Sequence, residues 1–316
     1  MKAFQHSPVL LEESIRELRL EPGLQVLDGT LGGGGHASRF LSEILPDGWL
    51  YACDLDREAL EAGGGRLGEI ASDHWTLYHG SVSEWLLSDT PPPPLDRVFL
   101  DLGVSSHQID TATRGFSFQS DGPLDMRMNQ SEGALTAAEV VNTYSEKALA
   151  DLLWTYGEER RSRRMARAIV DRRAASPFET TLDLAMTLER VAPRRGERLH
   201  PATRAFQALR IEVNDEIGRL ERALESIWPA LVVGGRLAVI TFHGLEVRVV
   251  RRFAKERARS YTVVGERDIP EWRQPKEPDL RPAVRKSILP SEREALLNPR
   301  ARSAQLRVFE KIHDSG

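Results

Sequence analysis

The sequence is poor in cysteine and in long apolar runs, and each shortage narrows what the chain can be. Cys53 is the only cysteine, so neither an internal disulfide nor a metal site built from several thiolates can form. The apolar run near the N-terminus, Val9 to Leu11, is too short for a signal peptide or a membrane span. We therefore expect a soluble, cytoplasmic protein that makes no contact with membranes.

A strong excess of charge of either sign is also absent. The chain has 43 Lys and Arg residues against 47 Asp and Glu residues, a formal net charge of −4, which argues against a purely electrostatic nucleic-acid binder. A local basic surface is still compatible with this balance, because binding responds to patches rather than to the sum. With 41% hydrophobic residues among 316, the chain can bury a full core.

Short apolar segments alternate with helical ones in the first third of the sequence. Strands are predicted at Gln25–Asp28, Trp49–Asp54, Trp75–His79 and Arg97–Leu102, with helices over Ala37–Leu45 and Ala59–Ile70. This alternation is typical of βαβ units and predicts an α/β fold with a doubly wound sheet.

The alternation then stops, and from Gly103 to Pro201 only helices are predicted. They include one near Leu149–Tyr156 that begins at a Thr143/Glu146 capping box, and two over 160–175 and 182–191. A single long helix from Phe206 to Pro229 and strands at Arg236–Phe242 and Gln305–Phe309 complete the prediction. We expect a core made of residues 1–105 and 206–316, interrupted by a helical insertion at 106–205.

A glycine-rich turn follows the first predicted strand and opens a helix. Backbone N–H groups at such a turn approach nucleotide-like ligands, and an acid about 20 residues further on, here Asp54, can bind ribose hydroxyls. Gly32, Gly34 and Ala37 fit the spacing of a dinucleotide site, whereas Asp28, Gly32 and Gly34 fit that of an S-adenosylmethionine site. A carboxylate inside the turn would repel a pyrophosphate but suits a cationic ligand, which favours S-adenosylmethionine.

Two further features extend this site. Asp101 ends the fourth predicted strand, so Asp28, Asp54 and Asp101 are expected along one rim of the sheet, where ligands of open α/β sheets bind. The histidines share no metal-ligand spacing and no cysteine supports them, so no metal site is expected.

Several segments together resemble the bacterial small-subunit (16S) ribosomal RNA cytosine-N4 methyltransferases, and the match runs nearly end to end. They are His6–Leu11, Asp28–His36, Leu100–Ser106, Arg114–Phe118, Gly122–Met128, Thr155–Arg160, His200–Arg204, Phe206–Ile211, Val213–Asn214 and Asn298–Ser303. The resemblance implies a Rossmann-like core interrupted by a helical domain. It also implies transfer of a methyl group from S-adenosylmethionine to N4 of a cytidine in the decoding region of 16S rRNA, within the small ribosomal subunit.

The resemblance also implies site residues and reveals departures. The implied cofactor contacts are Gly34, Gly35, His36, Asp54, Val82, Asp101 and Gln108. Val82 stands where the family usually has Phe, so it can pack on an adenine but not stack with it. Gly244 and Val247 replace a Ser and an Asp of the family pattern, so no role is carried over to those positions.

Chemistry at a cytosine amine needs a group that the sequence does not supply in the usual place. The N4 lone pair is delocalised into the ring, so an acceptor near N4 would activate it and take up its proton. Asp125 is the candidate, with a structural pairing to Arg127 or Arg114 as the alternative. Phe116 and Phe118 are candidates for stacking on the unstacked base, or for the core, whereas Trp154 is expected to pack internally.

Arginines gather in the predicted insertion. Seven lie between Arg160 and Arg173 against one acid, Asp171, and Arg160, Arg164 and Arg167 recur at helical spacing. We expect this face to bind RNA phosphates, with the basic stretch from Arg248 to Arg259 as the alternative. An NAD-dependent oxidoreductase, a non-catalytic RNA-binding module and a methyltransferase for another nucleic acid remain as competing hypotheses. Oligomeric state is not predicted.

Overall fold

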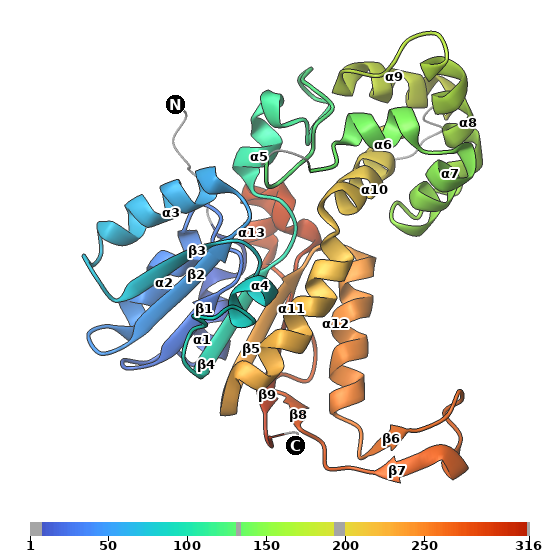
Figure 1. Ribbon diagram of the computed structural model, residues 1–316. Coiled ribbons are helices and arrows are strands. Elements are labelled where there is room, and N and C mark those ends of the chain that lie inside the picture. The colour runs from blue at the N-terminus through green and yellow to red at the C-terminus, as the bar shows by residue number, and fades with distance from the viewer. Residues whose placement is uncertain (1–7, 131–133, 193–199, 315–316) are drawn as a thin grey trace. The chain divides into compact units, whose positions relative to one another are not determined.

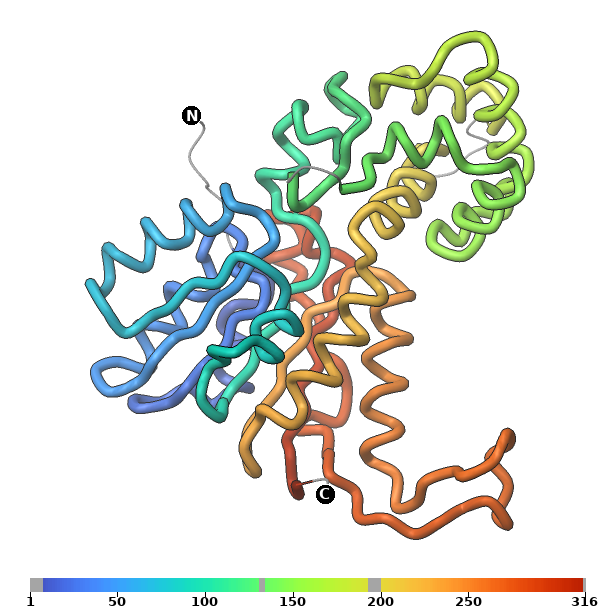
Figure 2. Tube along the Cα trace, viewed as in Figure 1, coloured from blue at the N-terminus to red at the C-terminus, as the bar shows by residue number. Residues whose placement is uncertain are grey.

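The computed structural model describes residues 8–130, 134–192 and 200–314 (Figures 1 and 2). His6 and Ser7 of the first family motif lie outside these residues. The chain divides into two compact units, one made of 1–103 with 217–316 and the other of 104–216. The sequence prediction puts the divisions after residues 105 and 205, so the second division lies later in the chain than expected.

The first unit, called the Rossmann unit below, is built on a seven-stranded sheet in the order β3-β2-β1-β4-β5-β9-β8. Strands β1 to β5 are parallel, and β9 is antiparallel to both of its neighbours. The strands are β1 Gln25–Asp28, β2 Trp49–Asp54, β3 Trp75–His79, β4 Leu95–Asp101, β5 Leu231–Thr241, β8 Leu280–Pro282 and β9 Gln305–Lys311. The predicted α/β fold is confirmed, and the first three strands have the predicted bounds.

Helices cover both faces of this sheet because successive residues of each strand point to opposite sides. Val26, Phe99 and Ala238 face one core, with α1 Leu11–Leu18, α2 Gly35–Ile44 and α3 Arg57–Gly68. Leu27, Val98 and Leu237 face the other core, with α4 Val82–Leu86, α11 Glu216–Ala230 and α12 Gly244–Arg257 (Figure 1). Continuous apolar strands such as β4 are the consequence.

The second unit, called the helical unit, has its own hydrophobic core. Its elements are α5 Ser106–Asp110, the 3-10 helix η1 Ala112–Arg114, α6 Ala137–Thr143, α7 Glu146–Thr155, α8 Ser162–Arg173, α9 Thr181–Val191 and α10 Ala202–Asn214. Phe178, Leu184 and Leu209 are among its buried residues. No strand is assigned to the described residues of this unit, as predicted.

Three local predictions for the helices are wrong. The long helix over 206–229 is two helices, α10 and α11, because Asp215 between them has left-handed backbone (φ 46°). The side chain of Ser145, not Thr143, caps α7 by accepting a hydrogen bond from the Ala148 N–H. Trp154 is 59% exposed rather than internal.

The last third of the Rossmann unit carries elements that the sequence did not predict. A two-stranded sheet, β6 Tyr261–Val263 with β7 Arg273–Pro275, follows α12. The helix α13 Glu292–Leu297 and two 3-10 helices, η2 Pro270–Trp272 and η3 Pro299–Ser303, complete the unit. Among the described residues, we find no helix with the length and apolar character needed to cross a membrane.

Candidate cofactor site at the carboxyl ends of the strands

The glycine turn after β1 is held by its neighbours in the sheet. The Gly29 N–H donates to the Phe99 carbonyl of β4 at 2.9 Å, and the Leu31 N–H donates to the Cys53 carbonyl of β2 at 3.0 Å. Gly32 and Gly34 have left-handed backbone, with φ of 51° and 73°, which glycine adopts without strain. The turn is therefore fixed before any ligand arrives.

Gly34 also permits a close approach between two segments. A Cβ on Gly34 would lie 2.9 Å from the Gly63 Cα of α3, and one on Gly63 would lie 2.6 Å from the Leu31 side chain. The glycines of α3, which weaken the helix prediction, are thus explained at Gly63 by packing against the turn.

Asp28 and Asp101 meet through the hydroxyl of Thr30. The Thr30 N–H donates to Asp28 Oδ1 at 3.0 Å, and the Asp101 N–H donates to the Thr30 hydroxyl at 2.6 Å. Burial, opposed by the Thr30 hydrogen bond and reinforced by the charge of Asp54, raises the pKa of Asp28 to about 7. Burial and the neighbouring charges of Asp28 and Glu246 raise the pKa of Asp101 well above its usual range.

Asp54, at the end of β2, supports the turn as well as facing the site. Its Oδ2 accepts from the Gly32 N–H at 2.8 Å, and its Oδ1 accepts from the Asp56 N–H at 2.9 Å. Burial raises the pKa of Asp54 to about 6 against the opposing effect of these hydrogen bonds. Each carboxylate oxygen keeps a second lone pair, so ribose hydroxyls can still bind.

His36, in the first turn of α2, is packed between Asp101 and the N-terminal segment. Its Nε2 lies 3.0 Å from the Val9 carbonyl and donates to it, and its Nδ1 lies 3.6 Å from Asp101 Oδ2. The ring is 6% exposed and its centroid lies 4.5 Å from that of Phe99. His36 therefore orients Asp101 at the rim.

The residues of this site fit a ligand with positive charge. Asp28 Oδ2 and Asp101 Oδ1 are buried and have no hydrogen-bond partner in the described part of the chain. Buried carboxylates without partners are costly, and a cation beside them removes that cost. S-adenosylmethionine supplies a sulfonium and an ammonium, whereas a pyrophosphate would add negative charge. Asp28, Asp101 and the turn would hold its methionine part, and Asp54 its ribose.

The two remaining predicted cofactor contacts lie elsewhere. Val82 is 4% exposed and belongs to the core around Trp85 and Leu100, where a Cβ on Gly29 would touch it. Gln108 belongs to the helical unit, where its side chain caps α5 by accepting from the Ser105 N–H at 3.0 Å. Their contact with the cofactor stays a prediction.

Asp125, the predicted proton acceptor, lies in the helical unit and is ion-paired. Its carboxylate accepts from the Arg127 guanidinium at 2.9 and 2.8 Å and from the Arg127 N–H at 2.9 Å. Although burial opposes it, this pairing lowers the pKa of Asp125. Arg114, the other partner considered, donates instead to the carbonyls of Arg127 and Met128. Asp125 is therefore held as an anion that can accept a hydrogen bond but is a weak base.

The aromatic candidates for base stacking pack against the core of the helical unit. The Phe118 ring lies 4.7 Å from that of His200 and 4.8 Å from that of Phe206, and Phe116 packs on the same core.

The predicted basic face differs in detail from the expectation. Arg160 precedes α8, which begins at Ser162, so it does not share a helical face with Arg164 and Arg167 as predicted. All three are nevertheless exposed, as is Arg163. Arg172 and Arg173 have internal partners, Asp183 and the Val141 carbonyl. Arg167 lies 3.8 Å from Asp171 in an exposed pair that contributes little.

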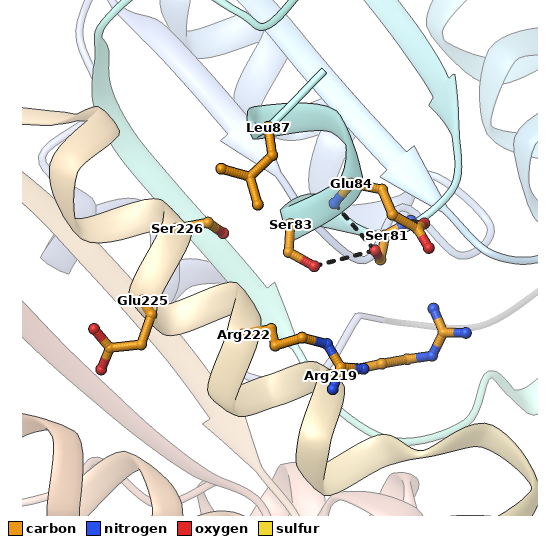
Figure 3. A pocket seen from close by; sticks show the side chains of 8 residues that line it. All are labelled: Ser81, Ser83, Glu84, Leu87, Arg219, Arg222, Glu225 and Ser226. Carbon is orange, nitrogen blue, oxygen red and sulfur yellow. Dashed lines mark hydrogen bonds between the residues drawn. The ribbon is translucent and has the colours of Figure 1, made fainter.

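A groove of about 600 Å³ opens beside α4 and α11 (Figure 3). Its charges are already balanced, because Glu84 faces Arg219 and Arg222, and Glu225 pairs with Arg257 at 3.0 Å. None of its lining residues belongs to the glycine turn, so we assign it no ligand. The lining residues are Ser81, Ser83, Glu84, Leu87, Arg219, Arg222, Glu225 and Ser226.

The sheet, the glycine turn and the row of buried acids define an S-adenosylmethionine-dependent methyltransferase. The chain belongs to the MraW methylase family, whose model matches residues 3–312, so the resemblance read from the sequence is confirmed. Two relatives named "Ribosomal RNA small subunit methyltransferase H", from Heliobacterium mobile and Syntrophotalea carbinolica, are each 45% identical, covering 98% of this chain and 99% of their own. The solved structure of an rRNA methylase from Streptococcus thermophilus is 12% identical and covers 97% of this chain and 98% of its own, with a TM-score of 0.45. That likeness adds nothing about function.

Proposed function

We propose that this chain methylates N4 of a cytidine in the decoding region of 16S rRNA, within the small ribosomal subunit. The observation that carries the cofactor assignment is the pair of buried, unpartnered carboxylate oxygens of Asp28 and Asp101 beside the glycine turn. The names of the relatives support the substrate class. Ribosomal subunits as substrate also support a cytoplasmic location.

The reaction is an in-line displacement, so positioning supplies much of its rate. S-adenosylmethionine supplies the methyl group when bound. Gly34, Gly35 and the acids of the rim hold it, and Asp54 fixes its ribose. Asp125, kept ionised by Arg127, is proposed to accept a hydrogen bond from the N4 amine, which draws the lone pair out of the ring.

The helical unit is proposed to bind the RNA through Arg160, Arg164 and Arg167. They are exposed and two of them lie on α8, in the part of the chain where arginines most outnumber acids. The exposed Trp154 of the neighbouring α7 adds an aromatic surface on which a base can stack. Such phosphate contacts carry affinity but no sequence information.

Mapping of modified nucleosides by mass spectrometry tests this function directly. 16S rRNA from cells without this gene should lack one N4-methylcytidine, and the gene in trans should restore it. Purified protein should transfer labelled methyl groups to free 16S rRNA or to small subunits from the deletion strain. An unchanged modification pattern, or label at another base, would refute the proposed substrate. Family membership argues against the oxidoreductase hypothesis, and measured turnover would exclude a non-catalytic RNA-binding module.

A further inference from the structure

His243 and Glu246 form a buried pair just beyond β5. Glu246, in the first turn of α12, accepts hydrogen bonds through Oε2 from the backbone N–H groups of Phe242 at 2.6 Å and His243 at 3.1 Å. Its Oε1 lies 3.0 Å from His243 Nε2. Glu246 is only 3% exposed, so one carboxylate fixes both the loop and the side of the imidazole that faces it.

The imidazole has hydrogen-bonding capacity that nothing in the described chain uses. Both ring nitrogens of His243 are shielded from solvent without a hydrogen bond of good geometry in the described residues. Buried polar atoms normally have partners, so an unused pair calls for one. With Nε2 facing the Glu246 carboxylate, the proton of the neutral ring belongs on Nε2, which leaves Nδ1 as the basic atom.

This pair lies at the same rim of the sheet as the cofactor site. Asp101 at the end of β4 is in register with Ile240 of β5, and the Leu102 N–H donates to the Ile240 carbonyl at 3.1 Å. Beyond that, a Cβ on Gly103 would lie 3.7 Å from the Phe242 ring, one residue before His243. His243 therefore follows the strand directly beside the one that carries Asp101.

The order of the strands gives this position a meaning. The ribose acid Asp54 is on β2, the glycine turn follows β1, and Asp101 is on β4, so the cofactor groups run in spatial order toward β5. The group that receives the methyl must approach from beyond Asp101. In the Rossmann unit, β5 with His243 is the next strand along the rim.

We propose that His243 is the catalytic base of this reaction, accepting the proton of the cytosine amine on Nδ1 while Glu246 holds the ring. The amine nitrogen forms a bond to the methyl carbon as the bond from that carbon to sulfur breaks, and the sulfur keeps the electron pair. The nitrogen then carries one proton too many, and His243 takes it. The imidazolium that results lies beside the Glu246 carboxylate and later loses the proton to water. This assignment rests on the proposed function and gives Asp125 a hydrogen-bonding role only.

Chemical rescue tests the assignment. His243→Ala should transfer methyl groups to small subunits from the deletion strain about 10²- to 10⁴-fold more slowly than the unmodified protein. Added imidazole should restore part of that rate, because it supplies the missing base. Its affinity for S-adenosylmethionine should stay within twofold by calorimetry. Asp125→Ala is the matched control, and imidazole should not restore its rate.

Each outcome decides one point. If His243→Ala retains the full rate, or if its rate falls without rescue while cofactor affinity is normal, His243 is not the base. Should the alanine variant fail to fold, His243→Asn keeps a polar side chain in the loop and must show the same loss of rate. If the unmodified protein itself transfers no methyl to rRNA, the proposed function fails, and this result is distinct from a failure of His243 alone.

Discussion

Binding of S-adenosylmethionine should release a proton from the Asp28 and Asp101 pair. Without ligand, burial raises the pKa of Asp28 to about 7, so its neutral form is favoured below that pH. A cationic ligand needs the ionised form and lowers the pKa again. Cofactor affinity should therefore rise with pH up to about 7, and one or more protons should leave on binding.

The magnitude follows from the pKa of Asp28. With a value of about 7, its ionised fraction increases from about 3% at pH 5.5 to about one half at pH 7. The dissociation constant should fall about 15-fold over that range, or roughly 1.6 kcal/mol. The range ends near pH 7 because the α-amino group of the ligand begins to lose its own proton at about pH 8.

Calorimetry in buffers of different ionisation enthalpy measures both the affinity and the protons released. Asp28→Asn should flatten the pH dependence and weaken binding, while its Oδ1 keeps the Thr30 contact. The raised pKa also means that the ligand-free protein loses stability as pH rises from about 4 to 7. The variant should therefore melt at a higher temperature than the unmodified protein at pH 7.5. A dissociation constant that does not change between pH 5.5 and 7, with no proton released, would refute this reasoning.

Three further predictions concern single roles. Asp54→Asn should weaken cofactor binding by about 1.5–3 kcal/mol, because an amide nitrogen accepts neither from the Gly32 N–H nor from a ribose hydroxyl; an unchanged affinity by calorimetry would contradict it. Asp125→Asn should slow methyl transfer about tenfold in single-turnover assays with cofactor affinity unchanged, since a neutral amide is a weaker acceptor; a normal rate would leave it only the Arg127 pairing. Replacing Arg160, Arg164 and Arg167 together by Gln should weaken RNA binding and reduce its log–log salt slope by about 2–3 units, and an unchanged slope would show that RNA docks elsewhere.

The arginine experiment needs a control for net charge alone. A second triple variant removes the same charge at exposed positions scattered over the Rossmann unit and should leave the salt slope nearly unchanged. Its substitutions are Arg19→Gln, Arg267→Gln and Arg285→Gln.

The sequence predicts those parts of the fold whose cause is local. Strands β1, β2 and β3 follow from short apolar runs between helical segments, and the acids at strand ends follow from their spacing to the glycines. The break at Asp215 has no Gly or Pro to signal it, because a left-handed aspartate is fixed by packing on both sides. Two candidate caps, Thr143 and Ser145, lie within one turn, and only tertiary structure decides between them.

The candidate site divides in the same way. The glycine turn and Asp54 are local to one βαβ unit and are evident from the sequence. The ion pair of Asp125 was one of two alternatives, which only geometry resolves. The pairing of Asp101 with the His243 loop joins segments separated by the whole helical unit, so no spacing in the sequence announces it.

The place of β9 in the sheet affects when the protein can fold during its own synthesis. β9, the last strand described, lies between β5 and β8 and supplies hydrogen bonds to both. The helical unit, residues 104–216, has its own core and can form while later residues are still being translated. The Rossmann sheet cannot close until residues 305–311 have left the ribosome that makes them. A nascent chain stalled before that point should present an unpaired β5 edge, a surface that chaperones recognise and that favours aggregation.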